Sequence, residues 1–245
     1  MGPSLASNIN CDNIKLKYND YLKDINCEST MFIAPANEQE VLNIVSKFIN
    51  KSSEDVNGLS MKIIKYISHV IVKPLTYICN LSLKTGVFPN DLKTAKVLPM
   101  FKSGDKSEVS NYRPVSILPQ LSKVLEKLFE TRLRNYINQK GFLFKGQYGF
   151  RKNHSTNLAL NEMVNMIVDA IDKKMYSIGV FIDLKKAFDT VDHKLMIDKL
   201  WYYGIRGTAS NFLISYLNIE NNLLNIRKMS HVNRKYYVEF PKVQY

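Results

Sequence analysis

GVFIDLKKAFDT (residues 179–190) is an apolar run that ends in one carboxylate, Asp183, with a second, Asp189, six residues further on. Side chains in a strand alternate between its two faces, so a strand predicted over 176–184 has its aliphatic residues on one face and Asp183 on the other. The aliphatic residues are Ile178, Val180, Ile182 and Leu184. A carboxylate at the end of a strand can project into a cleft and bind Mg²⁺, or it can cap the turn that follows.

Two long amphipathic patterns lie upstream of this strand. One predicts a helix from about Gln120 to Gln139, with charged residues on the opposite face and Gly141 at its end. Its apolar stripe comprises Leu121, Val124, Leu125, Leu128, Phe129, Leu133, Tyr136 and Ile137. The other predicts a helix over 156–172, with a stripe of Leu160, Met163, Val164, Ile167 and Ile171. We interpret both stripes as hydrophobic core.

Four further helices are predicted from apolar spacing. One covers about 38–49, one ends near Lys84, and two follow the strand at 193–203 and 208–217. The helix that ends near Lys84 contains Pro74, where it must bend or a new helix must start. Residues suited to capping these helices are Asn37 with Glu40, Gly86, Asp192, Gly204 and Thr208.

Two short apolar runs within residues 95–119 flank a polar Ser-Gly-Asp turn, which predicts a two-stranded β-ribbon. Pro99 and Pro114 confine these strands to sheet edges, because a proline cannot donate a ladder hydrogen bond. Helices and short strands alternate irregularly along the chain. The predicted class is therefore α+β, largely helical.

Composition describes a basic globular chain of 245 residues, of which 45% are hydrophobic. Its formal net charge is +12 and its isoelectric point about 9.4. A surplus of this size favours an anionic partner, usually nucleic acid and less often a membrane surface.

Cysteine usage and hydropathy exclude several other classes. The cysteines at 11, 27 and 79 form no CxxC pair and no even set, so neither a disulfide framework nor a zinc site is predicted. Apolar runs stay shorter than the roughly 18 residues of a membrane span. We therefore expect an intracellular chain without a membrane partner.

Four motifs resemble the reverse transcriptases of LINE-like, non-LTR retrotransposons of the jockey type, and they occur in the family's order. FIDLKKAFDTVDHKLM (181–196) resembles the first palm motif, in which an Asp and three residues precede Ala-Phe-Asp. KVLPMFKSGDKSEVSNYRPVSILP (96–119) resembles the fingers motif around Asn-Tyr-Arg-Pro, and QYGFRKNHST (147–156) the motif that follows it. KLWYYGIRG (199–207) resembles the helix after the first palm motif. The resemblance covers about 38–217.

The resemblance implies the fingers and the opening of the palm of a right-hand polymerase, with an incomplete antiparallel palm sheet. A group-II-intron-like or telomerase-like polymerase would share this class, but the motifs fit less well. The expected divisions are a loose lead-in at 1–36, a helical extension at 37–90, fingers at 91–175, the start of the palm at 176–217, and a divergent basic tail at 218–245.

The resemblance also implies a role for individual residues. Asp183 would be the catalytic carboxylate and, with the Leu184 carbonyl, a ligand of Mg²⁺ or Mn²⁺. The implied nucleotide-binding residues are Lys102, Arg113, Arg151, Ala187 and Phe188, with the two arginines near the triphosphate and Phe188 at the steric gate under the sugar. Lys102 can equally be an exposed turn lysine. The implied partners are an RNA template, a DNA primer and deoxynucleoside triphosphates, in the nucleus and cytoplasm; the oligomeric state is left open.

A second metal-binding carboxylate is expected in this family from an Asp-Asp turn that follows a Pro-Gln-Gly motif. Neither occurs in the sequence, whose last aspartate is Asp198. We therefore expect residues 1–245 to be a fragment without polymerase activity by itself. The family function is RNA-directed DNA polymerase, and the alternative is a non-catalytic remnant that binds nucleic acid.

Overall fold

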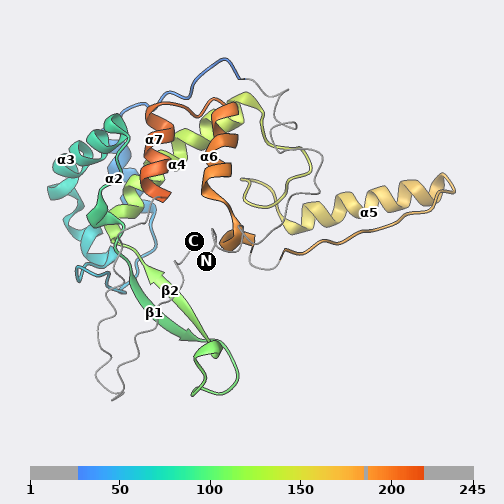
Figure 1. Ribbon diagram of the computed structural model, residues 1–245, viewed down its shortest axis with the longest axis horizontal. Helices are drawn as coiled ribbons and strands as arrows, with labels where there is room; N and C mark the ends of the chain where they lie inside the picture. The colour runs from blue at the N-terminus through green and yellow to red at the C-terminus, as the bar shows by residue number, and fades with distance from the viewer. Residues whose placement is uncertain (1–26, 185–186, 218–245) are drawn as a thin grey trace. The chain divides into compact units, whose positions relative to one another are not determined.

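The computed structural model describes residues 27–184 and 187–217 (Figure 1). These residues form helices and one two-stranded antiparallel sheet, as expected for a mixed α and β fold. The chain divides into two compact units: unit 1 comprises 1–134 and 188–245, and unit 2 comprises 135–187. The tail predicted over 218–245 lies outside the described residues.

Most of the helices begin in unit 1, and their bounds lie close to those predicted. They are α2 (Glu38–Lys47), α3 (Met61–Thr85), α4 (Gln120–Lys140), α6 (His193–Tyr202) and α7 (Thr208–Leu217). The predicted caps Asn37 and Asp192 accept hydrogen bonds from the Glu40 and Leu195 amides. Thr208, predicted as an N-cap, is instead the first helical residue of α7, and α3 continues through Pro74.

Gly86 shows why the end of α3 requires a glycine. Its φ is +71°, a left-handed conformation that closes the helix. A Cβ at this position would lie 2.8 Å from the Thr208 carbonyl oxygen, so a larger residue would also push α7 away. Unit 1 therefore depends on close backbone packing at this point.

The core of unit 1 forms where α3, α4 and α7 contribute aromatic and aliphatic side chains. The Phe129 ring of α4 stacks on the Phe212 ring of α7 at a centroid distance of 4.3 Å. Phe88, which follows α3, meets the same Phe212 ring edge-on at 5.5 Å. Val124 and Leu128 are completely buried. The stripe predicted on 120–139 is thus core, as expected.

Residues 27–36 are packed against the rest of unit 1, although the sequence predicts a loose lead-in there. The Met31 amide donates to the Gly204 carbonyl oxygen at 2.8 Å, and the Met31 side chain is buried. Asn80 of α3 makes two hydrogen bonds to the backbone of Ala36, one as acceptor and one as donor. Irregular backbone can be held this firmly by single long-range contacts, which leave no periodic pattern in the sequence.

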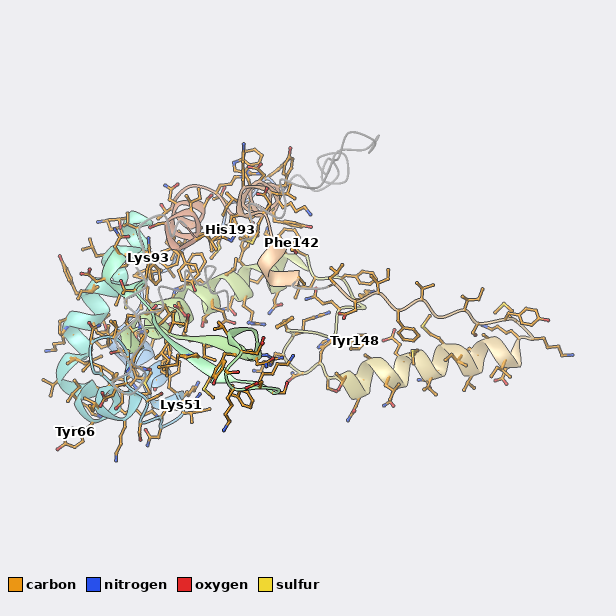
Figure 2. The ribbon with its side chains drawn as sticks, turned by 60° about the horizontal axis from the view of Figure 1, so that its bottom comes forward. Lys51, Tyr66, Lys93, Phe142, Tyr148 and His193 are labelled. Carbon is orange, nitrogen blue, oxygen red and sulfur yellow. The ribbon has the colours of Figure 1, made fainter. Side chains whose placement is uncertain are left out.

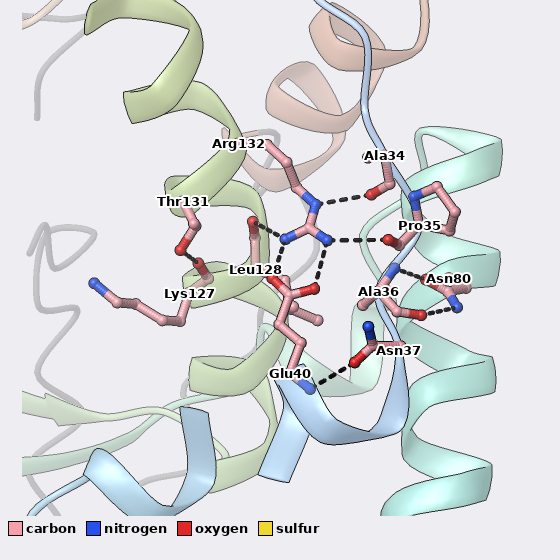
Figure 3. A network of polar contacts seen from close by, with 10 residues as sticks. All are labelled: Ala34, Pro35, Ala36, Asn37, Glu40, Asn80, Lys127, Leu128, Thr131 and Arg132. Atoms are coloured by element: carbon pink, nitrogen blue, oxygen red, sulfur yellow. Dashed lines mark hydrogen bonds and ion pairs between the residues drawn. The ribbon is translucent and has the colours of Figure 1, made fainter. Parts of the chain in front are cut away.

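Arg132 of α4 joins the same segment to the core (Figure 3). Its two terminal nitrogens pair with the two carboxylate oxygens of Glu40 at 2.6 and 2.8 Å. Its Nε donates to the Ala34 carbonyl oxygen at 2.8 Å, and Nη2 donates to that of Pro35. A guanidinium is suited to this role because its five donors have a fixed planar arrangement.

Unit 2 contains α5 (Thr156–Asp172), and here the sequence interpretation of core is wrong. The helix forms with the predicted bounds and with Ser155 as its N-cap. None of its residues is buried, and the exposed fraction of its stripe reaches 65% at Ile171. Figure 2 shows its side chains projecting from the helix. Amphipathic spacing produced the helix, but the described part of the chain does not cover its apolar face.

The strand predicted over 176–184 is also absent from the structure. The segment runs back along α5 without regular secondary structure (Figures 1 and 2). Its alternating apolar residues are exposed, by 89% at Ile178 and 83% at Ile182. A strand requires a partner to receive its backbone hydrogen bonds, and the described residues place none beside it. The prediction of a strand was therefore wrong for this structure.

Candidate functional site

The predicted ribbon forms and carries two of the candidate residues. Strand β1 (Lys96–Phe101) pairs antiparallel with β2 (Tyr112–Ile117), and Pro99 lies opposite Pro114. Both prolines fit at the same rung because their missing N–H groups are then not needed for the ladder. The ribbon is largely exposed toward its tip.

Lys102 and Arg113 belong to one face of this ribbon. Arg113 lies opposite Met100 in the register, and Lys102 comes two residues after Met100 on the same side of the alternation. The ladder continues to Lys102, whose amide donates to the Asn111 carbonyl oxygen at 2.8 Å. Both side chains are exposed. Two exposed cations on one face of a ribbon have the charge and the donors that phosphate oxygens accept.

The loop at the ribbon tip has a defined conformation, which fixes the position of the Lys102 backbone. Asn111 donates from its side chain to the Asp105 carbonyl oxygen at 2.9 Å. Gly104 has a φ of +95°, and a Cβ there would lie 2.6 Å from the Asn111 Nδ2 atom. The Ser107 amide donates to the Asp105 carboxylate, which lowers the pKa of that carboxyl group. A preformed loop reduces the entropy lost when a ligand binds.

Asp55, a residue that no sequence motif indicated, anchors the base of the ribbon. This buried carboxylate accepts hydrogen bonds from the Asn57 and Leu59 amides through Oδ1. Through Oδ2 it accepts one from the Gln120 amide at 2.8 Å, at the junction between β2 and α4. The run Asp-Val-Asn-Gly could have suggested a local turn. It carries no indication of the contact with Gln120, which is 65 residues away.

Arg151 lies in unit 2 and is held by its own loop. Its Nη1 donates to the Phe144 carbonyl oxygen at 3.1 Å and to that of Gln147 at 3.5 Å. Phe150 and Asn153 beside it have positive φ angles of 60°, so the loop has an unusual backbone shape. In this structure the guanidinium therefore stabilises the loop that presents it.

Asp183 and Leu184 end the exposed segment that follows α5. A carboxylate and a backbone carbonyl are oxygen donors of the kind that Mg²⁺ accepts together with substrate phosphates and water. Among residues 27–184 and 187–217, no group of three acidic, histidine or cysteine side chains is arranged to hold a metal ion. Asp183 and the Leu184 carbonyl are thus two oxygen donors, which by themselves are fewer than a divalent metal ion takes.

Ala187 is the first residue of a short 3₁₀ helix (Ala187–Thr190). The side chain of Phe188, the predicted steric gate, lies outside what the structure describes. Of the predicted nucleotide-binding residues, Lys102 and Arg113 are brought onto one face of unit 1, while Arg151 and Ala187 belong to unit 2. None of the helices within the described residues combines the length and hydropathy needed to cross a bilayer.

Comparison with known proteins gives one matching family, described as reverse transcriptase (RNA-dependent DNA polymerase), over residues 102–235. The chain is 33% identical over 162 residues to an RNA-directed DNA polymerase from the mobile element jockey of Drosophila melanogaster, covering 66% of this chain and 18% of the relative. It is 30% identical over 209 residues to a probable RNA-directed DNA polymerase from transposon BS of the same fly, covering 82% and 22%.

A third relative, a probable RNA-directed DNA polymerase from the Drosophila melanogaster X-element, is 29% identical over 164 residues, covering 66% of this chain and 18% of the relative. The chain thus spans about a fifth of the length of the curated relatives it matches. The matched range 102–235 contains all the candidate nucleotide-binding and metal-binding residues.

Proposed function

Because the chain belongs to the reverse transcriptase family, we propose that it forms part of an RNA-directed DNA polymerase of a LINE-like, jockey-type retrotransposon. The family match over 102–235 carries the proposal. In the proposed arrangement, the ribbon belongs to the fingers and the segment ending at Asp183 belongs to the palm of a right-hand polymerase. The proposed substrates are an RNA template, a DNA primer and deoxynucleoside triphosphates.

In the proposed site, this chain's residues mainly bind and position the reactants. Lys102 and Arg113 contact the triphosphate oxygens from the ribbon face that they share, because both are exposed cations on one side of the ladder. Arg151 would have to exchange its loop carbonyl contacts for phosphate oxygens. Ala187 leaves room for the nucleotide, and Phe188 rejects a 2′-hydroxyl group.

A divalent ion fits beside Asp183 and the Leu184 carbonyl, which are hard oxygen donors. When bound, it would neutralise charge on the phosphates and on the attacking and leaving oxygens. Asp183 would hold that ion's position relative to the primer end, and positioning supplies much of the catalysis in phosphoryl transfer. The second carboxylate would come from the family's Asp-Asp turn.

Primer extension on a primed RNA template tests this proposal. The protein is a chimera in which a palm segment from a jockey-type relative, carrying the Asp-Asp turn, follows residue 217. We expect synthesis with Mg²⁺ or Mn²⁺, a loss of at least about 100-fold in Asp183→Asn, and no loss in the matched control Asp172→Asn. Equal activity of the two variants would refute the role of Asp183, and a chimera that folds without any synthesis would count against the polymerase assignment.

The second candidate function, nucleic-acid binding without catalysis, is favoured by the net charge of +12. Binding through phosphates releases counterions, so affinity should fall with salt by a log–log slope of roughly −0.7 per contact on single strands. Affinity for unrelated oligonucleotides over a range of salt measures this slope. Salt-dependent binding by a chimera that never extends a primer would support this candidate over the polymerase.

A further inference from the structure

The second face of the ribbon, opposite Lys102 and Arg113, carries an aromatic pair. Phe101 and Tyr112 are direct cross-strand partners, and their ring centroids lie 5.5 Å apart at an interplanar angle of 63°. Phe101 lies near the tip of the ribbon, and 40% of its surface is exposed to solvent although it is an apolar residue. Aromatic cross-strand pairs stabilise a ribbon, and that role alone does not require the ring to remain open to solvent.

Lys106 connects this pair to the loop at the tip. Its ammonium nitrogen lies 5.8 Å from the Phe101 ring centroid, over the ring. The Tyr112 hydroxyl donates to the Lys106 carbonyl oxygen at 2.9 Å, so the loop that carries this lysine is tied to the second ring. Both rings and the lysine are therefore held near one another before any ligand binds.

Stacking surfaces for nucleic-acid bases combine these features. A base stacks on an exposed aromatic ring whatever its sequence, and a nearby cation contacts the phosphate that follows. The ribbon and its loop (96–117) contain four basic residues against two acidic ones, so the charge favours a polyanion. The basic residues are Lys96, Lys102, Lys106 and Arg113.

We propose that the Phe101–Tyr112 face of the ribbon stacks an unpaired base of a single-stranded nucleic acid, with Lys106 contacting the adjacent phosphate. The proposal rests on the proposed function only in that nucleic acid is the ligand. It concerns only the Phe101–Tyr112 face and does not depend on the triphosphate contacts proposed for the opposite face, which carries Lys102 and Arg113.

Binding of fluorescent single strands to residues 1–245 tests the proposal without metal ion, nucleotide or primer. Each oligoribonucleotide is compared with a strand of the same length and charge that lacks bases, and the series is repeated with DNA. We expect Phe101→Leu to weaken binding of base-containing strands by about 5- to 150-fold. Strands without bases should bind this variant and the unaltered protein equally.

Three further variants separate stacking from ribbon stability. Phe32→Leu is the matched control, because Phe32 is an exposed phenylalanine elsewhere in unit 1, and it should change nothing. Tyr112→Phe keeps the ring and should retain binding. Phe101→Trp offers a larger ring and should bind base-containing strands at least as tightly as the unaltered protein.

Two results would overturn the proposal. In one, Phe101→Leu weakens binding of both kinds of strand equally, which would mean that the pair only stabilises the ribbon. In the other, no variant changes the affinity, which would mean that this face meets a different partner, such as an apolar protein surface. Because primer extension plays no part, either result leaves the polymerase proposal to its own experiment. Similar losses with RNA and DNA would identify the base, and not the sugar, as the group recognised.

Discussion

Helices α4 and α5 have the same kind of amphipathic sequence but differ in how far their apolar faces are buried. Each has an apolar stripe opposite a polar face, and each forms a helix with nearly the predicted bounds. Val124 and Leu128 on α4 are completely buried, whereas no residue of α5 is buried. The difference teaches that an amphipathic stripe specifies a helix and the face it needs to cover, while burial depends on what the rest of the protein places against that face.

The surfaces that meet the two helices explain the contrast. The α4 stripe meets the aromatic core that includes Phe212, and its polar side is fixed by Arg132 and Glu40. Beside α5 runs the segment 176–184, which forms no strand within the described residues. A sheet that included this segment would present its aliphatic face as a cover for α5. In the proposed right-hand arrangement, such a sheet belongs to the palm.

Hydrogen exchange should show the largest difference between the two regions. Amides in the buried middle of α4 exchange only when the protein unfolds globally. We therefore expect their exchange to be slowed by about 10⁴-fold or more. Amides at 176–184 should exchange at nearly the rate of an unfolded chain. Strong protection of 176–184 in a monomer would break the comparison, because it would reveal a strand partner.

A pair of leucine truncations tests burial directly. Leu128→Ala removes a completely buried side chain and should lower the free energy of unfolding by about 2–5 kcal/mol. Leu160→Ala in α5 removes one that is 53% exposed and should change it by about 0.5 kcal/mol or less. Urea unfolding measures both. A large effect at Leu160 would mean that the α5 stripe is covered in solution.

Two arginines on the polar side of α4 test whether a contact network stabilises the protein more than a surface ion pair does. Arg132→Lys retains the charge but cannot reproduce the five contacts of the guanidinium, so we expect a loss of about 1–3 kcal/mol. Arg134→Lys is the matched control, since its pair with Glu130 is exposed, and it should cost about 0.5 kcal/mol or less. Equal effects would show that the network in Figure 3 adds nothing beyond a surface ion pair.

Glu126 and Glu130 on the same helix should give the smallest effects, with opposite dependence on pH. Burial raises the pKa of Glu126 above its ordinary 4.5, more than the Ser122 hydrogen bond and the Lys123 charge lower it. The folded state then binds more protons than the unfolded state just above pH 4.5, so this group lowers stability as pH rises through that window. Glu126→Gln should remove the decline.

For Glu130, burial raises the pKa, but hydrogen bonds and charges from Lys127 and Arg134 outweigh it and lower the pKa below 4.5. Its contribution to stability is present above pH 4.5 and is lost as pH falls through the lowered pKa. Glu130→Gln should therefore weaken the protein slightly at neutral pH and equal the unaltered protein in acid. Unfolding midpoints between pH 3 and 7 would show whether the two profiles slope in opposite directions, and parallel slopes would contradict the assignment.

Local pattern determined much of this protein. The apolar stripes of α4 and α5, the capping residues Asn37 and Asp192, and the paired prolines of the ribbon each act over a few residues, and each predicted its element from sequence. The four motifs, one of which contains Asp183, likewise predicted the family, because residue types at fixed spacing are a property of the chain alone.

Tertiary structure decided the rest, because those outcomes depend on contacts between residues far apart in sequence. Asp55 accepts a hydrogen bond from the Gln120 amide, 65 residues away, and Arg132 pairs with Glu40, 92 residues away. No local pattern in the sequence predicts either contact. The same reason governs 176–184: alternation gives a segment two faces, but it becomes a strand only when another strand receives its backbone hydrogen bonds.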